Sequence, residues 1–76
     1  MHDINDMLFF AHVVKVRSFS AAARRLDVSK SRVSKAVARL ESDLGVRLLH
    51  RSTRSLSLTD VGEAYFEHCD RILEEL

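Results

Sequence analysis

Apolar residues recur at three- and four-residue steps in three stretches of the chain, which is the spacing of one helix face. Residues 4–16 are predicted to form the first helix, and a second, shorter helix follows with Ser20 as its expected N-cap. The third helix is predicted over about residues 30–44, because Ser29 is a good N-cap and Gly45 can end a helix in the left-handed conformation. The three buried stripes are expected to be Ile4, Met7, Phe10, Ala11 and Val14, then Ala22, Ala23 and Leu26, then Val33, Val37, Leu40 and Leu44.

The hydrophobic pattern changes after Gly45. Leu56-Ser57-Leu58 alternates as a half-buried strand does, and Leu48-Leu49 precedes it across a polar Ser52-Thr53-Arg54 centre, so a short two-stranded wing is predicted. Thr59 is then the expected N-cap of a fourth helix. This helix carries the periodic set Val61, Tyr65, Cys69, Ile72 and Leu76 and has no stop signal, so we expect it to continue in a longer protein.

These elements predict a mainly α-helical winged helix-turn-helix fold, with a three-helix core, a short two-stranded β wing and a long C-terminal linker helix. Residues 1–58 would be the DNA-binding domain and residues 59–76 the linker and dimerisation helix. The helix-turn-helix is centred on Asp27-Val28-Ser29, with small residues before the turn and apolar anchors after it. An ordinary three-helix protein that happens to carry basic residues is the alternative.

The charge is divided unevenly along the chain, although its net value is only +1. Residues 15–54 hold eleven Lys and Arg against three acids, a net charge of +8, and the two flanks together carry −7. A basic middle between acidic ends indicates one surface that faces a polyanion. Solvated helix faces would give the same blocks without that function.

The start of the third helix presents hydroxyl and cationic groups, which can bond base edges or phosphates in the major groove. The helix N-terminus also favours a phosphate. In the wing, Arg54 is expected to contact DNA, and Arg51 either does so or braces the wing against an acid. The predicted DNA contacts are Ser29, Lys30, Ser31, Arg32, Ser34, Lys35, Arg39, Arg51 and Arg54.

The sequence contains no pattern that is typical of an enzyme or of a metal site. Cys69 is the only cysteine, the histidines are scattered, and neither a nucleophile with its base nor a glycine-rich phosphate loop occurs. We therefore expect no catalysis, no cofactor and no metal. The N-terminal stretch resembles neither a signal peptide nor a membrane-spanning segment, which predicts a cytoplasmic protein without a membrane partner.

Residues 4–62 resemble the N-terminal DNA-binding domain of LysR-type transcriptional regulators. The resemblance rests on SFSAAARRLDVSKSRVSKAVARLESDLGVRLLHRSTRSLSLTDVG from Ser18 onward, where all segments fall in family order. It implies a bacterial origin, a dimerising linker helix and a C-terminal domain of periplasmic-binding-protein type that binds a small-molecule effector. Lys30 stands where the family often has Gln, and Arg17 where it often has a small residue. Lys30 therefore favours guanine or phosphate over adenine.

The stripe of the fourth helix, Val61, Tyr65, Cys69, Ile72 and Leu76, is the predicted homodimer interface. Two copies packed antiparallel would place two recognition helices on one face of double-stranded DNA, which requires an inverted-repeat operator. The stripe could instead cover the first helix of its own chain, through Tyr65 against Phe10. The alternative class of function is a protein-interaction domain with a vestigial helix-turn-helix. Such a domain would bind its protein partner through the fourth helix.

Overall fold

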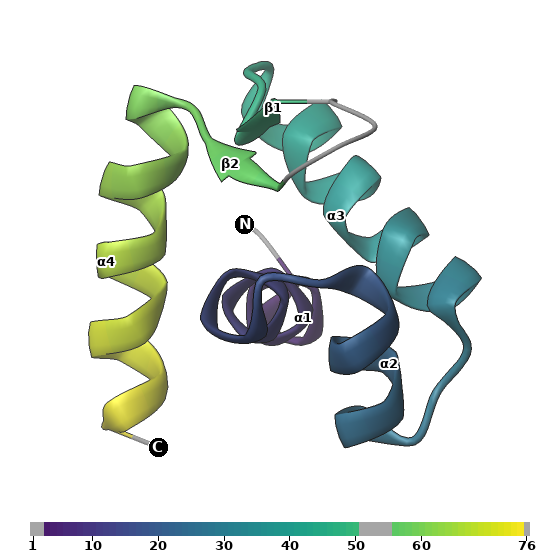
Figure 1. Ribbon diagram of the computed structural model, residues 1–76. Helices are drawn as coiled ribbons and strands as arrows, with labels where there is room; N and C mark the ends of the chain where they lie inside the picture. Colours follow the sequence, from purple (N-terminus) through teal and green to yellow (C-terminus); the bar gives the residue numbers. More distant parts are fainter. Residues whose placement is uncertain (1–2, 51–55, 76) are drawn as a thin grey trace.

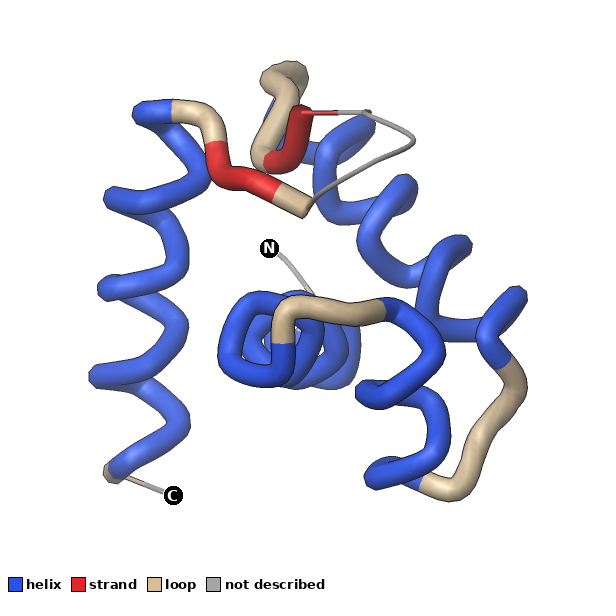
Figure 2. The backbone as a smooth tube through the Cα atoms, in the orientation of Figure 1, coloured by secondary structure: helices blue, strands red, loops and turns tan. Residues whose placement is uncertain are grey.

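The computed structural model describes residues 3–50 and 56–75, in which four helices surround a common core and two short strands form a hairpin-like ladder (Figure 1). Helix α1 crosses the middle of the domain, with α3 on one side of it and α4 on the other (Figures 1 and 2). The elements are α1 (Ile4–Val16), α2 (Phe19–Leu26), α3 (Lys30–Leu44), β1 (Leu49–His50), β2 (Ser57–Leu58) and α4 (Asp60–Glu74). The predicted mainly helical, winged arrangement is confirmed.

Each helix begins at a polar residue whose side chain accepts a hydrogen bond from a backbone N–H two or three residues later. These N-caps are Asp3, Ser18, Ser29 and Thr59. The cap of α2 was expected at Ser20, and that prediction is wrong. Ser18 has the extended backbone of a cap (φ −164°), because the preceding residue already ends α1 in the left-handed conformation.

Three helices end at a residue in the left-handed region: Arg17 (φ 56°), Asp27 (φ 56°) and Gly45 (φ 71°). Gly45 confirms the predicted end of α3. Asp27 defines the turn between α2 and α3, where the Val28 backbone N–H donates to the Ala23 carbonyl at 3.0 Å. This closed turn sets the direction in which α3 leaves α2.

The core lies where α1, α2 and α3 meet and extends to β1 and α4. Val33, Val37 and Leu40 are fully buried, as predicted. The predicted stripe of α1 is wrong at Ile4, which is 44% exposed, whereas Phe9 and Val13 are buried. The reason is that α1 is covered by α3 and by α4, so it buries more than one stripe (Figure 1).

The ladder of the wing is antiparallel, with Leu49 opposite Leu58 and His50 opposite Ser57. Both strands belong to the region predicted to form the wing. The predicted turn centre, Ser52-Thr53-Arg54, lies outside the described residues. Leu48 and Leu49 are almost completely buried, so the base of the wing is part of the core.

Helix α4 does not present its predicted stripe as one exposed face. Cys69 is fully buried in its own chain, and the ring centroid of Tyr65 lies 5.9 Å from that of Phe10 on α1. Val61, in contrast, is 48% exposed. Tyr65 and Cys69 face inward because this side of α4 packs against α1. Leu76 lies outside the described residues.

Candidate nucleic-acid interface

The first two turns of α3 are polar and exposed on one side and completely buried on the other. Val33, Ala36, Val37 and Leu40 have no exposed surface, which fixes the rotation of the helix about its axis. Figure 1 shows the start of α3 at the edge of the domain away from α4. The exposed residues of this segment are Ser29, Lys30, Ser31, Arg32, Ser34 and Lys35, all of them predicted DNA contacts.

An open hollow of about 260 Å³ lies beside these turns, lined by Ser29, Ser31, Arg32, Lys35 and Arg39. Three of its five lining residues are cations, and the α3 N-terminus adds its own positive end. A surface of this kind attracts phosphate groups. The structure thus brings together seven of the nine predicted DNA contacts, and the other two, Arg51 and Arg54, lie outside the described residues.

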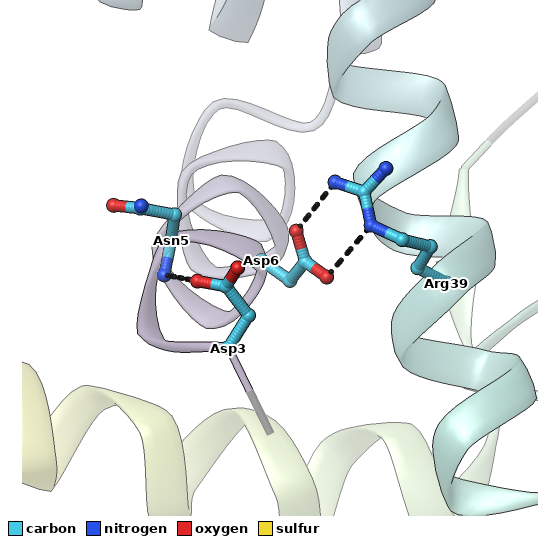
Figure 3. Close-up of polar contacts among 4 residues, drawn as sticks. All are labelled: Asp3, Asn5, Asp6 and Arg39. Atoms are coloured by element: carbon cyan, nitrogen blue, oxygen red, sulfur yellow. Dashed lines mark hydrogen bonds and ion pairs between the residues drawn. The ribbon is translucent and has the colours of Figure 1, made fainter. Parts of the chain in front are cut away.

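Arg39 forms a two-pronged ion pair with Asp6 of α1 (Figure 3). Its Nη2 donates to Oδ1 at 2.8 Å and its Nε donates to Oδ2 at 3.1 Å. The Asp6 side chain is 3% exposed, while that of Arg39 is 59% exposed. The hydrogen bond and the charge of Asp6 raise the pKa of Arg39.

This pair gives Arg39 a structural partner that sequence reasoning missed. The two residues are 33 positions apart, and Asp6 was counted only as part of an acidic flank. The available signal was the position of Asp6 itself, because it lies four residues before Phe10 and therefore on the same side of α1 as that apolar residue. The exposed side of the Arg39 guanidinium still faces the hollow described above.

A second buried carboxylate, Glu41, joins the end of α3 to the wing. Its Oε2 accepts hydrogen bonds from the backbone N–H groups of Leu48 at 2.8 Å and Leu49 at 3.3 Å. Its Oε1 lies 3.9 Å from a guanidinium nitrogen of Arg47. Glu41 therefore satisfies two buried backbone donors at the start of β1 and just before it. Sequence reasoning assigned Glu41 no such role.

Thr59 fixes the start of α4 against the backbone just before β1. Its backbone N–H donates to the Leu48 carbonyl at 3.0 Å, and its hydroxyl donates to the Arg47 carbonyl at 2.6 Å. The same hydroxyl oxygen accepts from the Gly62 N–H at 2.9 Å. Because Glu41 binds backbone N–H groups of the same segment, α3 and α4 are joined through one short stretch of backbone.

The remaining polar side chains lie away from α3, and their interactions stabilise the fold. Lys15 pairs with Asp70 at 3.0 Å and ties α1 to α4. Burial raises the pKa of the Cys69 thiol to about 11 and that of the Tyr65 hydroxyl to about 12, so both are protonated at neutral pH. Among residues 3–50 and 56–75 no group of side chains could hold a metal ion, and no described helix is long and apolar enough to cross a membrane.

A helix-turn-helix with a two-stranded wing and a cationic first turn on its second helix is the architecture of a winged helix-turn-helix DNA-binding domain. Residues 4–63 match the family described as "Bacterial regulatory helix-turn-helix protein, lysR family". The chain belongs to this family of DNA-binding transcription regulators.

Relatives with curated names support this assignment. The chain is 53% identical over 75 residues to an HTH-type transcriptional regulator of Xanthomonas campestris, which covers 99% of this chain and 22% of the relative. It is 47% identical to the HTH-type transcriptional activator AaeR of Escherichia coli, covering 100% of this chain and 25% of that protein. The chain thus spans about a quarter of the length of these relatives.

Solved structures give the same fold. The DNA complex of the BenM DNA-binding domain with catB site 1 superposes with a TM-score of 0.92 at 27% identity, over 96% of this chain and 82% of that one. Full-length CbnR with its target DNA superposes with a TM-score of 0.88 at 40% identity, over 95% of this chain and 25% of that one.

Proposed function

We propose that this chain recognises a specific operator, with the first turns of α3 in the major groove of double-stranded DNA. The observation that carries the proposal is the division of α3 into a completely buried side and a side of exposed hydroxyl and cationic groups. Such a helix is presented on a rigid support, and its side chains match the acceptors of guanine and of the backbone. The DNA contacts in this proposal are Ser29, Lys30, Ser31, Arg32, Ser34 and Lys35, with Arg39 at the edge of the hollow and Arg51 and Arg54 from the wing.

Salt dependence of binding tests this proposal. A labelled duplex selected by the chain from a random-sequence pool is titrated at several salt concentrations, with fluorescence anisotropy as the readout. The logarithm of affinity should fall linearly with the logarithm of salt, by about 0.9 for each phosphate contacted. Absence of binding to any duplex would instead favour a protein-interaction domain.

Two lysine variants make the test specific to α3. Lys35→Ala should weaken binding and reduce the salt slope by about 1 if the amine contacts a phosphate. Lys15→Ala removes the same charge on the other side of the domain, where Lys15 pairs with Asp70, and should leave the slope unchanged. Equal effects of the two variants would mean that net charge, and not the α3 surface, governs binding.

We also infer that the domain dimerises through α4, on a face that differs from the predicted stripe. Helical spacing places Val61, His68 and Ile72 toward one edge of α4, and Glu63, Glu67 and Glu74 toward the other edge. Val61 is 48% exposed and Ile72 is only partly covered, which supports a contact along the first edge. Tyr65 and Cys69 lie beneath this surface, and the predicted interface residue Leu76 lies outside the described residues.

A two-fold arrangement of this kind presents two recognition helices to an inverted repeat. Sedimentation of Val61→Lys should show monomers that keep their helical content and lose affinity for an inverted repeat more than for a half-site. Glu67→Lys introduces the same residue on the opposite edge and should remain dimeric. A dimeric Val61→Lys variant would contradict the interface.

We expect the effector-binding function of the full-length regulator to reside in sequence outside these 76 residues, and we propose no enzymatic activity for this part. We expect the protein to act in the cytoplasm, because that is where an operator-binding role would be carried out.

A further inference from the structure

Three cations follow one another along the same side of α3: Arg32, Lys35 and Arg39, at three- and four-residue spacing. All three line the open hollow beside the start of the helix. The first and the last are each held by a side chain of α1. Asp6 binds Arg39 through two hydrogen bonds, and the Arg32 guanidinium lies over the ring of Phe9, 5.9 Å from its centroid.

The contact with Phe9 leaves the hydrogen-bonding capacity of Arg32 available. A guanidinium attracted to an aromatic face interacts through its charge, so its N–H donors stay available for hydrogen bonds to other groups. Arg32 remains exposed, and Phe9 is only 8% exposed because it belongs to the core. The ring is therefore a fixed platform, and the side chain above it still faces the solvent and the hollow.

We propose that Phe9 is a positioning residue for DNA recognition, which orients the Arg32 guanidinium toward its DNA acceptor before the duplex arrives. This inference rests on the proposed function of α3. An unsupported arginine at the start of a helix loses its rotamer freedom when it binds. An arginine already held over a rigid ring has lost part of that freedom, so binding orders less of the side chain.

The opposite effect on affinity would indicate a different role for the contact between Arg32 and Phe9. If the contact with Phe9 were a resting position that Arg32 must leave, removal of the ring would strengthen DNA binding. Arg32 lines the hollow at the start of α3 while it contacts Phe9, which argues for a productive contact. The sign of the change in affinity therefore separates the two arrangements.

A double-mutant cycle on the 76-residue chain tests the proposal. The dissociation constant for the selected duplex is measured for wild type, Phe9→Leu, Arg32→Met and the double variant, each below its melting temperature and corrected for folded fraction. Phe9→Leu should weaken binding about two- to fivefold, the range expected for an exposed cation–π contact. In the Arg32→Met background the same substitution should have no further effect.

Two further variants separate positioning from general destabilisation. Phe9→Tyr keeps an aromatic face and should retain wild-type affinity. Phe10→Leu is the matched control, because it makes the same chemical change one residue later on α1. Phe10 packs on Tyr65 of α4, and its loss should show no coupling to Arg32.

The outcomes distinguish this inference from the proposed function. A wild-type chain that binds no duplex, or binds without salt dependence, would overturn both. Salt-dependent binding that Arg32→Met weakens and Phe9→Leu does not would overturn the positioning role alone. Tighter binding by Phe9→Leu, or equal effects of Phe9→Leu in the two backgrounds, would also overturn it.

Discussion

Gly62, in the first turn of α4, lies against the backbone of Leu48, and substitution by Ala should push α4 away from the wing. A Cβ at this position would overlap the Leu48 carbonyl oxygen and lie 2.9 Å from its carbonyl carbon. Carbon atoms in contact normally lie about 3.5–4.0 Å apart. The obstructing atoms belong to the backbone, so no side-chain rotation can relieve the overlap.

The size of the effect follows from three contributions. Overpacking costs about 1–3 kcal/mol, and displacement of α4 strains the hydrogen bond between the Thr59 N–H and the Leu48 carbonyl, which contributes about 1 kcal/mol. Ala offsets about 1 kcal/mol through its higher helix propensity. We therefore expect Gly62→Ala to lower the free energy of unfolding by about 1–3 kcal/mol and Tm by at least about 4 °C.

Gly45 provides the matched comparison, because it needs glycine for a different reason. Nothing lies within 4 Å of a Cβ added there, but its φ is +71°. Gly45→Ala should cost about 1–2 kcal/mol through backbone strain, and Gly45→Asn should cost less because Asn tolerates this conformation. At Gly62 the order reverses, since the larger Asn should be worse than Ala. Thermal unfolding by circular dichroism measures all four variants. An unchanged or raised Tm for Gly62→Ala would refute the close approach of α4 to the Leu48 backbone.

Three further predictions concern the core and its buried polar groups. Arg39→Met should destabilise the domain more than Asp6→Asn does, because the first leaves a buried carboxylate unpaired while the second leaves a solvated guanidinium; equal losses in urea unfolding would contradict this. Leu40→Ala should cost about 2–5 kcal/mol, and an unchanged Tm would show that this side of α3 does not form the core. Burial raises the pKa of the Cys69 thiol from 9.0 to about 11, so its contribution to stability is complete below pH 9 and is lost as pH rises through 11. Tm should therefore fall more between pH 8 and pH 11 in wild type than in Cys69→Ala, and parallel curves would count against it.

The helix-turn-helix was predictable because its signals are local. Ser29 and Gly45 mark the two ends of α3, and the spacing of Val33, Val37 and Leu40 defines its buried side. The exposed residues at the start of α3 follow from the same spacing, since a helix that buries one side must present the other. Helix propensity, capping and periodicity act within a few residues, so the sequence shows them directly.

The position of α1 between two helices could not be predicted from its own residues. Its pattern indicated a single stripe, yet it is covered by α3 and by α4, and Phe9 and Val13 are buried as well. The same packing turned Tyr65 and Cys69 of α4 inward and left Val61 exposed. A stripe of apolar residues indicates that a helix packs against another element. It does not indicate whether that element belongs to the same chain.

By itself the sequence determined the helices, the N-caps of α3 and α4, the cationic start of α3 and the family to which the chain belongs. Only the tertiary structure decided which charges are paired. Asp6 and Arg39 meet across 33 residues, and Glu41 turns inward to the backbone of Leu48 and Leu49. The physical reason is range: a cap or a stripe is set by neighbours along one helix, whereas an ion pair or a buried carboxylate depends on where packing places two distant helices and a strand.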